Sequence, residues 1–108
     1  MKAMIAVLAT ALGLTLASGA FAADPKAAEA LARTSGCLAC HSIDKKVVGP
    51  AYKDVAAKYR NNKGAEAALI KKVKAGGKGT WGDIPKPPNS HVKDADIKTI
   101  VEWVLSLK

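Results

Sequence analysis

Residues 37–41 of the sequence read CLACH, and Cys37 and Cys40 are the only two cysteines of the 108-residue chain. His41 follows the second cysteine directly, and three interpretations of this grouping compete. A disulfide redox pair of the thioredoxin type needs a βαβ context, which the helical pattern around this pentapeptide does not supply. A zinc site needs further cysteine or histidine ligands, and His91 is the only other histidine.

The third interpretation is the attachment of a c-type haem, which uses both thiols and the imidazole at once. Each thiol adds across one haem vinyl group, and the histidine that follows is placed to reach the iron. We therefore predict one covalently attached haem c. It would be held by thioether bonds to Cys37 and Cys40, with His41 as the proximal axial iron ligand.

The first 22 residues are predicted to be a cleaved secretory signal peptide. A basic residue near the start precedes an apolar run over residues 5–16, and small residues stand where a signal peptidase reads the chain. We place the cleavage between Ala22 and Ala23. The apolar run is shorter than the roughly 20 residues that a bilayer span needs, so no membrane span is expected in the mature form. The mature domain, residues 23–108, is expected in the bacterial periplasm.

Cleavage would leave 86 of the 108 residues, without either methionine or the single phenylalanine of the chain. A chain of this length forms one domain with a small core. Domains of this size often depend on a metal, a disulfide or a cofactor for stability. An attached haem would supply the apolar body that the core lacks.

The mature chain is strongly basic. The whole chain has 17 basic and 9 acidic side chains, and the signal peptide contains one lysine, so 16 against 9 leaves a net charge of +7. No nucleic-acid-binding motif and no interleaved aromatic residues accompany these charges, so nucleic-acid binding is not expected. A cationic face that steers an acidic protein partner fits better. The basic residues that would form it are Lys45, Lys46, Lys53, Lys58, Lys71, Lys72, Lys74 and Lys78.

Four segments of the mature chain carry helical patterns, and none alternates with period two, so an all-α fold is predicted. Asp24 and Pro25 indicate the start of the first helix, and Gly36 its end. The last helix shows the clearest apolar spacing, with acidic residues at its start. The predicted helices cover residues 25–34, 53–59, 65–74 and a final segment that begins near Asp94 and carries apolar positions 97, 100, 101, 104 and 105.

Several stretches of the chain match a known family: GCLACHSID, VGPAYKDVAAKY, GAEA, GTWGDIP, PPN and EWVLSLK. From Gly36 to the C-terminus, the sequence resembles a short bacterial class I cytochrome c of the cytochrome c-551 type. The resemblance implies about four short helices wrapped around one haem c, in a monomeric protein.

The resemblance also implies roles for individual residues. The carbonyl oxygen of Pro50 would accept the Nδ1–H of His41 and so fix the ring. Trp81 would place its indole N–H near a buried haem propionate, the alternative being a core tryptophan. Asn89 would donate a hydrogen bond near the distal iron ligand, the alternative being a turn residue. The remaining aromatic residues of the mature chain are expected to pack: Tyr52, Tyr59 and Trp103.

One position departs from the family pattern. Residues 84–91, here called the proline segment, read IPKPPNSH, and the family usually carries methionine between the first two of these prolines as the sixth iron ligand. This chain has Lys86 there, and the mature form contains no methionine at all. Ligation by histidine and methionine is therefore excluded.

Four alternatives remain for the sixth ligand. Lys86 can bind iron as a neutral amine, because burial and the ferric ion both favour loss of its proton. His91 can bind instead. The third alternative is an open or water-filled position, with Lys86 turned outward. The fourth is that another lysine or Asn89 binds the iron. A nitrogen ligand would lower the reduction potential below that of methionine-ligated relatives.

The sequence predicts a soluble carrier of one electron between respiratory partners. Acidic surfaces of a cytochrome complex, a terminal oxidase or a periplasmic reductase would be those partners. The alternative is a haem module that binds or senses NO, CO or peroxide at an open or displaceable sixth position. No nucleophile–base pair and no second metal site is evident in the sequence, so an enzyme is not expected.

Overall fold

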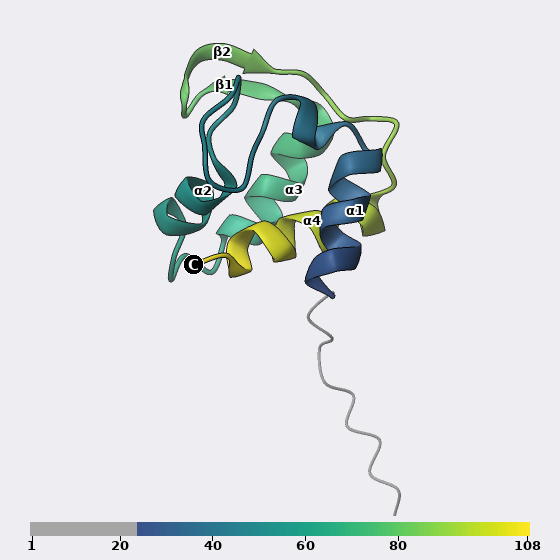
Figure 1. Ribbon diagram of the computed structural model, residues 1–108. Coiled ribbons are helices and arrows are strands. Elements are labelled where there is room, and N and C mark those ends of the chain that lie inside the picture. Colours follow the sequence, from purple (N-terminus) through teal and green to yellow (C-terminus); the bar gives the residue numbers. More distant parts are fainter. Residues whose placement is uncertain (1–23) are drawn as a thin grey trace, which may run out of the picture.

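The computed structural model describes residues 24–108. The predicted signal peptide and its cleavage between Ala22 and Ala23 lie outside the described residues. Within residues 24–108, no helix is long and apolar enough to cross a membrane. The described elements are α1 (Pro25–Thr34), a 3₁₀ turn η1 (Cys37–Ala39), α2 (Tyr52–Lys58), α3 (Ala65–Ala75), β1 (Gly77–Gly79), β2 (Gly82–Lys86) and α4 (Asp94–Ser106) (Figure 1).

Helix α1 begins and ends where the sequence predicts. The side chain of Asp24 accepts a hydrogen bond from the backbone N–H of Lys26 at 3.1 Å, and Pro25 occupies the first turn. Gly36 follows the helix with φ of 84°, a left-handed conformation that favours glycine. This turn leads the chain directly from α1 into the CLACH motif.

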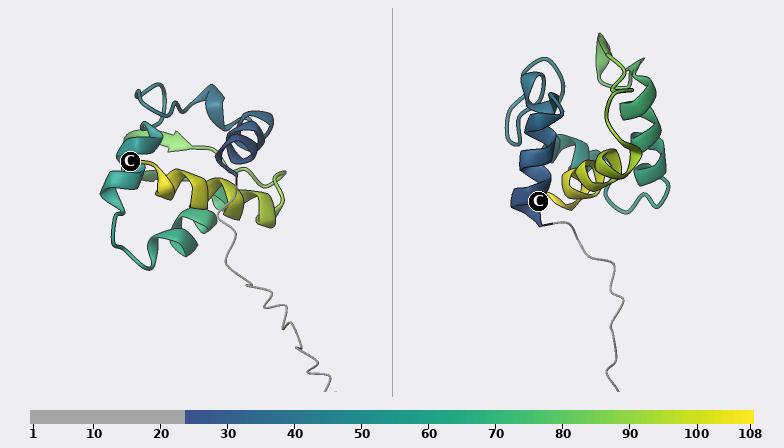
Figure 2. Two further views of the ribbon diagram at one scale, coloured as in Figure 1. Left: turned by 60° about the horizontal axis from the view of Figure 1, so that its bottom comes forward. Right: turned by 90° about the vertical axis from the view of Figure 1, so that its right-hand side faces the viewer.

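Helix α4 packs against the other three helices (Figure 2). Its apolar face contributes to two buried clusters, which confirms the spacing predicted for the last helix. The larger cluster joins it to α1 and α2, and the smaller one packs against α3. Trp103 is only 5% exposed and lies in the larger cluster, as predicted. The core residues of the two clusters are Ala28, Ala32, Tyr52, Val55, Ile100, Trp103 and Val104, and Val92, Ile97 and Val101.

Helices α2 and α3 lie within one residue of their predicted bounds. The small antiparallel sheet was not predicted. In it Gly77 pairs with Lys86, and Gly79 pairs with Gly82. Its strands are glycine-rich and almost fully exposed, so they lack the apolar alternation that identifies a half-buried strand. The all-α fold class holds, with this hairpin as a minor addition.

Candidate functional site

A cavity opens between the CLACH motif and the proline segment, with about 1270 Å³ of space between the atoms, its open mouth included. In the right panel of Figure 2, α1 and the motif stand on one side, α3 and the hairpin on the other, and α4 lies between them. The motif side contributes Cys37, Cys40, His41, Pro50 and Tyr52 to the lining. The opposite side contributes Trp81, Ile84, Pro85, Lys86, Pro87 and Asn89.

The imidazole of His41 is held from two directions. Its Nδ1 lies 2.8 Å from the carbonyl oxygen of Pro50, so Nδ1 carries the proton and donates it, and Nε2 keeps a free lone pair. A β-carbon at Gly49 would lie 2.9 Å from each ring nitrogen, so only glycine leaves room for the ring. The contact that the family resemblance implied for Pro50 is present.

The loop after the motif folds back onto it through backbone hydrogen bonds. The carbonyl oxygen of Cys40 accepts from the N–H of Val48 at 3.1 Å and of Gly49 at 2.8 Å. His41 also forms an isolated bridge with Lys46. These bonds bring Gly49 and Pro50 against the histidine ring, although they follow His41 by eight and nine positions along the chain.

Tyr52 supports the same ring. Its ring centroid lies 4.8 Å from that of His41 at an interplanar angle of 19°, and its other neighbour is Trp103, edge-on at 5.7 Å. Tyr52 is buried, as expected for a packing residue. Its stacking on His41 was not foreseen, because nothing in the sequence distinguishes a tyrosine that stacks on a ligand from one that fills a core.

Both cysteines are unpaired and half-buried. Burial raises the pKa of the Cys37 thiol, and a hydrogen bond with Tyr52 partly opposes this. Burial likewise raises the pKa of the Tyr52 hydroxyl. Within residues 24–108, no three histidine, cysteine or acidic side chains converge on a point where they would share a metal ion. The two thiols and His41 line the same cavity.

Lys86 lies across the cavity from the motif. Its Nζ donates to Oδ1 of Asn89 at 2.5 Å and to the carbonyl oxygen of Pro87 at 3.2 Å. Burial lowers the pKa of Lys86, while Cys37 and Cys40 oppose that shift. The resemblance implied that Asn89 donates near the distal ligand. In the structure the amide oxygen of Asn89 accepts a hydrogen bond from the lysine, whose ammonium group has only donors. The donor role of the Asn89 amide nitrogen stays a prediction.

The proline segment is held against the C-terminal end of α3. Gly76 has φ of 79°, and a β-carbon there would lie 2.7 Å from the carbonyl oxygen of Lys86 and 2.9 Å from the nitrogen of Pro88. The N–H of Asn89 donates to the carbonyl oxygen of Val73 at 3.0 Å. The rigidity of this segment therefore comes from its contacts with α3 as well as from its prolines.

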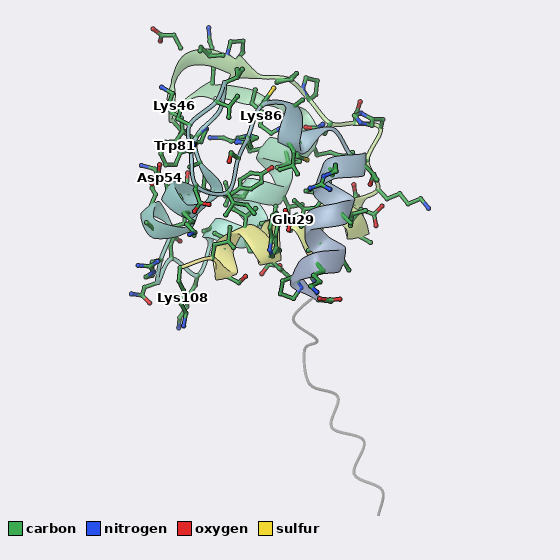
Figure 3. The ribbon with its side chains drawn as sticks, viewed as in Figure 1. Glu29, Lys46, Asp54, Trp81, Lys86 and Lys108 are labelled. Carbon is green, nitrogen blue, oxygen red and sulfur yellow. The ribbon has the colours of Figure 1, made fainter. Side chains whose placement is uncertain are left out.

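The predicted site residues Trp81 and His91 differ in whether they line the cavity. Trp81 lines the cavity and is 40% exposed, with Nζ of Lys58 5.4 Å from its ring centroid, so it is not the core tryptophan of the alternative interpretation. His91 is exposed and is not among the residues that line the cavity. Figure 3 shows Trp81 and Lys86 in the upper part of the molecule, which carries the hairpin.

The cavity residues fit a haem c group. Two free thiols at the spacing of its attachment motif lie on one wall, beside an imidazole with Nδ1 already occupied. Burial lowers the pKa of His41 and so favours the neutral imidazole that binds a metal, although the Pro50 hydrogen bond opposes the shift. Much of the remaining lining is apolar, which suits a flat organic cofactor.

Comparisons with known proteins agree with this fit. A family profile for cytochrome c matches residues 25–108. Cytochrome c-551 of Pseudomonas aeruginosa is 53% identical over 106 residues, which cover 98% of this chain and 96% of that protein. Cytochrome c-552 of Nitrosomonas europaea is 48% identical over 98 residues, which cover 90% and 95%. The crystal structure of Nitrosomonas europaea cytochrome c552 gives a TM-score of 0.72 at 50% identity, covering 74% of this chain and 99% of that one.

Proposed function

This chain belongs to the cytochrome c family, whose members carry covalently bound haem c, and we propose that it is a periplasmic carrier of single electrons. The proposal includes cleavage between Ala22 and Ala23, and a mature domain of residues 23–108. Haem c, once attached, supplies an iron centre that takes up and releases one electron. The protein's own residues hold that centre, limit access to it and present it to partners.

We assign Cys37 and Cys40 to the two thioether bonds and His41 to the proximal iron position. The hydrogen bond to Pro50 keeps the proton on Nδ1 of His41 and leaves Nε2 as the ligand atom. Gly49 and Tyr52 restrict rotation of the ring. A ligand that keeps its position needs little rearrangement when the oxidation state changes, which suits electron transfer.

Lys86 is our candidate for the distal iron position. The observation that supports it is its place in the same cavity as His41, on the opposite side, half-buried and held by α3 contacts. His91 is exposed and lies outside the lining, so it fits the role less well. If His41 and Lys86 both held the iron, small molecules such as CO would have no vacant site, and the protein would act as the carrier and not as the gas-binding alternative.

The exposed surface near the cavity suits brief docking with an acidic redox partner. Lys45 and Lys46 are exposed beside the exposed side chains of Val47 and Val48. Lysines around an apolar centre attract an acidic surface from a distance and leave a small contact once docked. We propose that the partner is an acidic face of a cytochrome complex, a terminal oxidase or a periplasmic reductase. Trp81, at the cavity mouth, is proposed to contact a haem propionate.

The test compares electron paramagnetic resonance spectra of the ferric wild type, Lys86→Ala and His91→Ala. We expect a low-spin wild type, a changed spectrum in Lys86→Ala and an unchanged one in His91→Ala. An unchanged Lys86→Ala spectrum would remove Lys86 as ligand. The carrier function is tested separately by adding CO to the reduced wild type, where fast stoichiometric binding would favour the gas-binding alternative.

A further inference from the structure

Three nearly consecutive residues in and after the last turn of α3 contact the proline segment or the turn that follows it. Val73 accepts a hydrogen bond from the N–H of Asn89 at 3.0 Å. Gly76 lies against the backbone of the proline segment without room for a side chain. Lys74, between them, makes a polar side-chain contact that can be removed without altering either backbone.

Lys74 joins α3 to the turn between the proline segment and α4. Its Nζ donates to the carbonyl oxygen of Val92 at 2.7 Å and lies 2.8 Å from Oδ1 of Asp94. Val92 is buried, and its own N–H donates to the carbonyl oxygen of Asn89 at 3.0 Å. A chain of contacts therefore runs from Lys74 through Val92 to Asn89, and Asn89 holds the amine of Lys86.

This arrangement differs from those of the other lysines. Within residues 24–108, no other lysine has both a carboxylate and a backbone carbonyl as partners. Asp94 is 83% exposed at its side chain, so water screens its ion pair with Lys74. The bond to the carbonyl oxygen of Val92 is partly buried and charge-assisted, which makes it the stronger of the two restraints.

We propose that Lys74 is a positioning residue for the distal side of the cavity. By holding Val92 it fixes the turn from Asn89 to Val92, and it thereby limits the movement of Lys86 away from the cavity. The part concerning Lys86 as an iron ligand rests on the proposed function. The restraint on the turn itself does not depend on it.

The experiment measures amide hydrogen exchange in the haem-loaded Lys74→Met protein, with Val101 as an internal reference. Val101 is buried in the middle of α4, away from the turn that Lys74 contacts, so its amide is expected to report opening of the helix as a whole. We expect exchange at Asn89 and Val92 to become at least about tenfold faster, the factor equivalent to about 1.4 kcal/mol, while exchange at Val101 changes much less. Unchanged exchange at both amides, or equal acceleration at Val101, would overturn the proposal.

Four further variants sharpen the result. Lys71→Met removes an exposed lysine from the same helix and should leave the amides of Asn89 and Val92 unchanged. In Lys74→Arg the guanidinium group can still donate to Val92 and Asp94, so this variant should restore slow exchange. Asp94→Asn removes the ion pair and one acidic charge at the start of α4 but keeps the bond to Val92, and it should have a smaller effect than Lys74→Met. If Lys74→Met does not fold, Lys74→Gln takes its place, and unchanged exchange in that variant also counts against the proposal.

A second readout connects the turn to the cavity. The rate at which imidazole binds to the ferric protein should rise at least about tenfold in Lys74→Met relative to Lys71→Met, because the distal segment opens more often. If Lys86→Ala leaves the ferric spectrum unchanged, the ligand assignment fails. The exchange rates at Asn89 and Val92 still decide the role of Lys74 in that case.

Discussion

The α-carbon of Gly49 lies directly against the imidazole ring of His41, with no space for a side chain between them. A β-carbon at this position would lie 2.9 Å from both Nδ1 and Nε2, closer than side-chain carbons approach ring atoms in folded proteins. The ring is also hydrogen-bonded to Pro50 and stacked on Tyr52. Any shift of the ring would therefore break one of these contacts.

Gly49→Ala is expected to destabilise the haem-loaded protein by about 1–3 kcal/mol, the usual cost of overpacking a well-filled site. It should also alter the ferric absorption spectrum, since the ring must turn or shift. Denaturant unfolding and absorption spectroscopy measure the two effects. Gly77→Ala is the control, because its β-carbon would meet only side-chain carbons of Lys72 at 3.6 Å or more. Equal stability of the two variants would contradict the tight contact at His41.

Gly76→Ala should destabilise the protein by more than Gly79→Ala. Both glycines have positive φ, 79° and 98°, so both substitutions carry a backbone cost of about 1 kcal/mol or more. Only Gly76 also faces the backbone of Lys86 and Pro88, while nothing lies within 4 Å of a β-carbon at Gly79. The difference between the two unfolding free energies isolates the close approach of the proline segment, and no difference would show that the segment adjusts freely.

Lys86→Met is expected to raise the reduction potential by at least about 60 mV, the step equivalent to a tenfold change in a one-electron equilibrium. The segment then presents a thioether, which favours ferrous iron relative to an amine. Lys78→Met is the matched control, because it removes a positive charge from an exposed residue of the cavity lining without touching the proposed ligand. Potentiometric titration measures both variants, and equal potentials in Lys86→Met and wild type would remove Lys86 from the iron.

Tyr52→Ala should cost about 3–5 kcal/mol of unfolding free energy, as for other buried aromatic side chains. It removes both the stacking on His41 and the edge contact with Trp103. Tyr52→Phe keeps both ring contacts and should cost about 1 kcal/mol or less. Chemical denaturation of the haem-loaded variants compares them. A large loss in Tyr52→Phe would show that the hydroxyl, rather than the ring, carries the stabilisation.

Glu102→Gln is expected to stabilise the protein at neutral pH. A hydrogen bond with Glu66 across α3 and α4, with smaller effects of burial and of repulsion by Glu66, raises the pKa of Glu102 above its ordinary 4.5, while Lys98 opposes the shift. A raised pKa means that the folded state favours the protonated carboxyl. Stability is therefore lost as the pH rises through the folded-state pKa.

The expected gain in Glu102→Gln is a few tenths of a kcal/mol at pH 7, the usual size for surface charge pairs. It should disappear below about pH 3, where the Glu102 carboxyl is protonated in both the folded and the unfolded state. Thermal or denaturant unfolding at the two pH values measures it. Glu29→Gln in α1 is the control, because Glu29 also pairs with a basic residue four positions away, Arg33. A pH-independent difference would contradict the raised pKa of Glu102.

The first and last helices were predicted from short-range signals. Asp24 and Pro25 start α1, Gly36 ends it, and the apolar spacing of α4 identifies its buried face, because capping and helical period depend only on neighbours in sequence. The hairpin was missed for the opposite reason. Its strands bury almost nothing, so the sequence has no apolar alternation there, and its pairing follows from the path between α3 and the proline segment.

By itself, the sequence determined the helical fold class and the haem attachment motif, because both depend on residue identity at fixed spacing. The exclusion of methionine as a ligand stays a prediction, since it depends on cleavage of the first 22 residues. Only the tertiary structure placed Lys86 in the cavity and left His91 exposed, although both belong to the same short segment. It also brought Gly49 and Tyr52 against His41 and paired the amide oxygen of Asn89 with the amine of Lys86. These features depend on contacts between segments far apart in the chain, which local patterns do not encode.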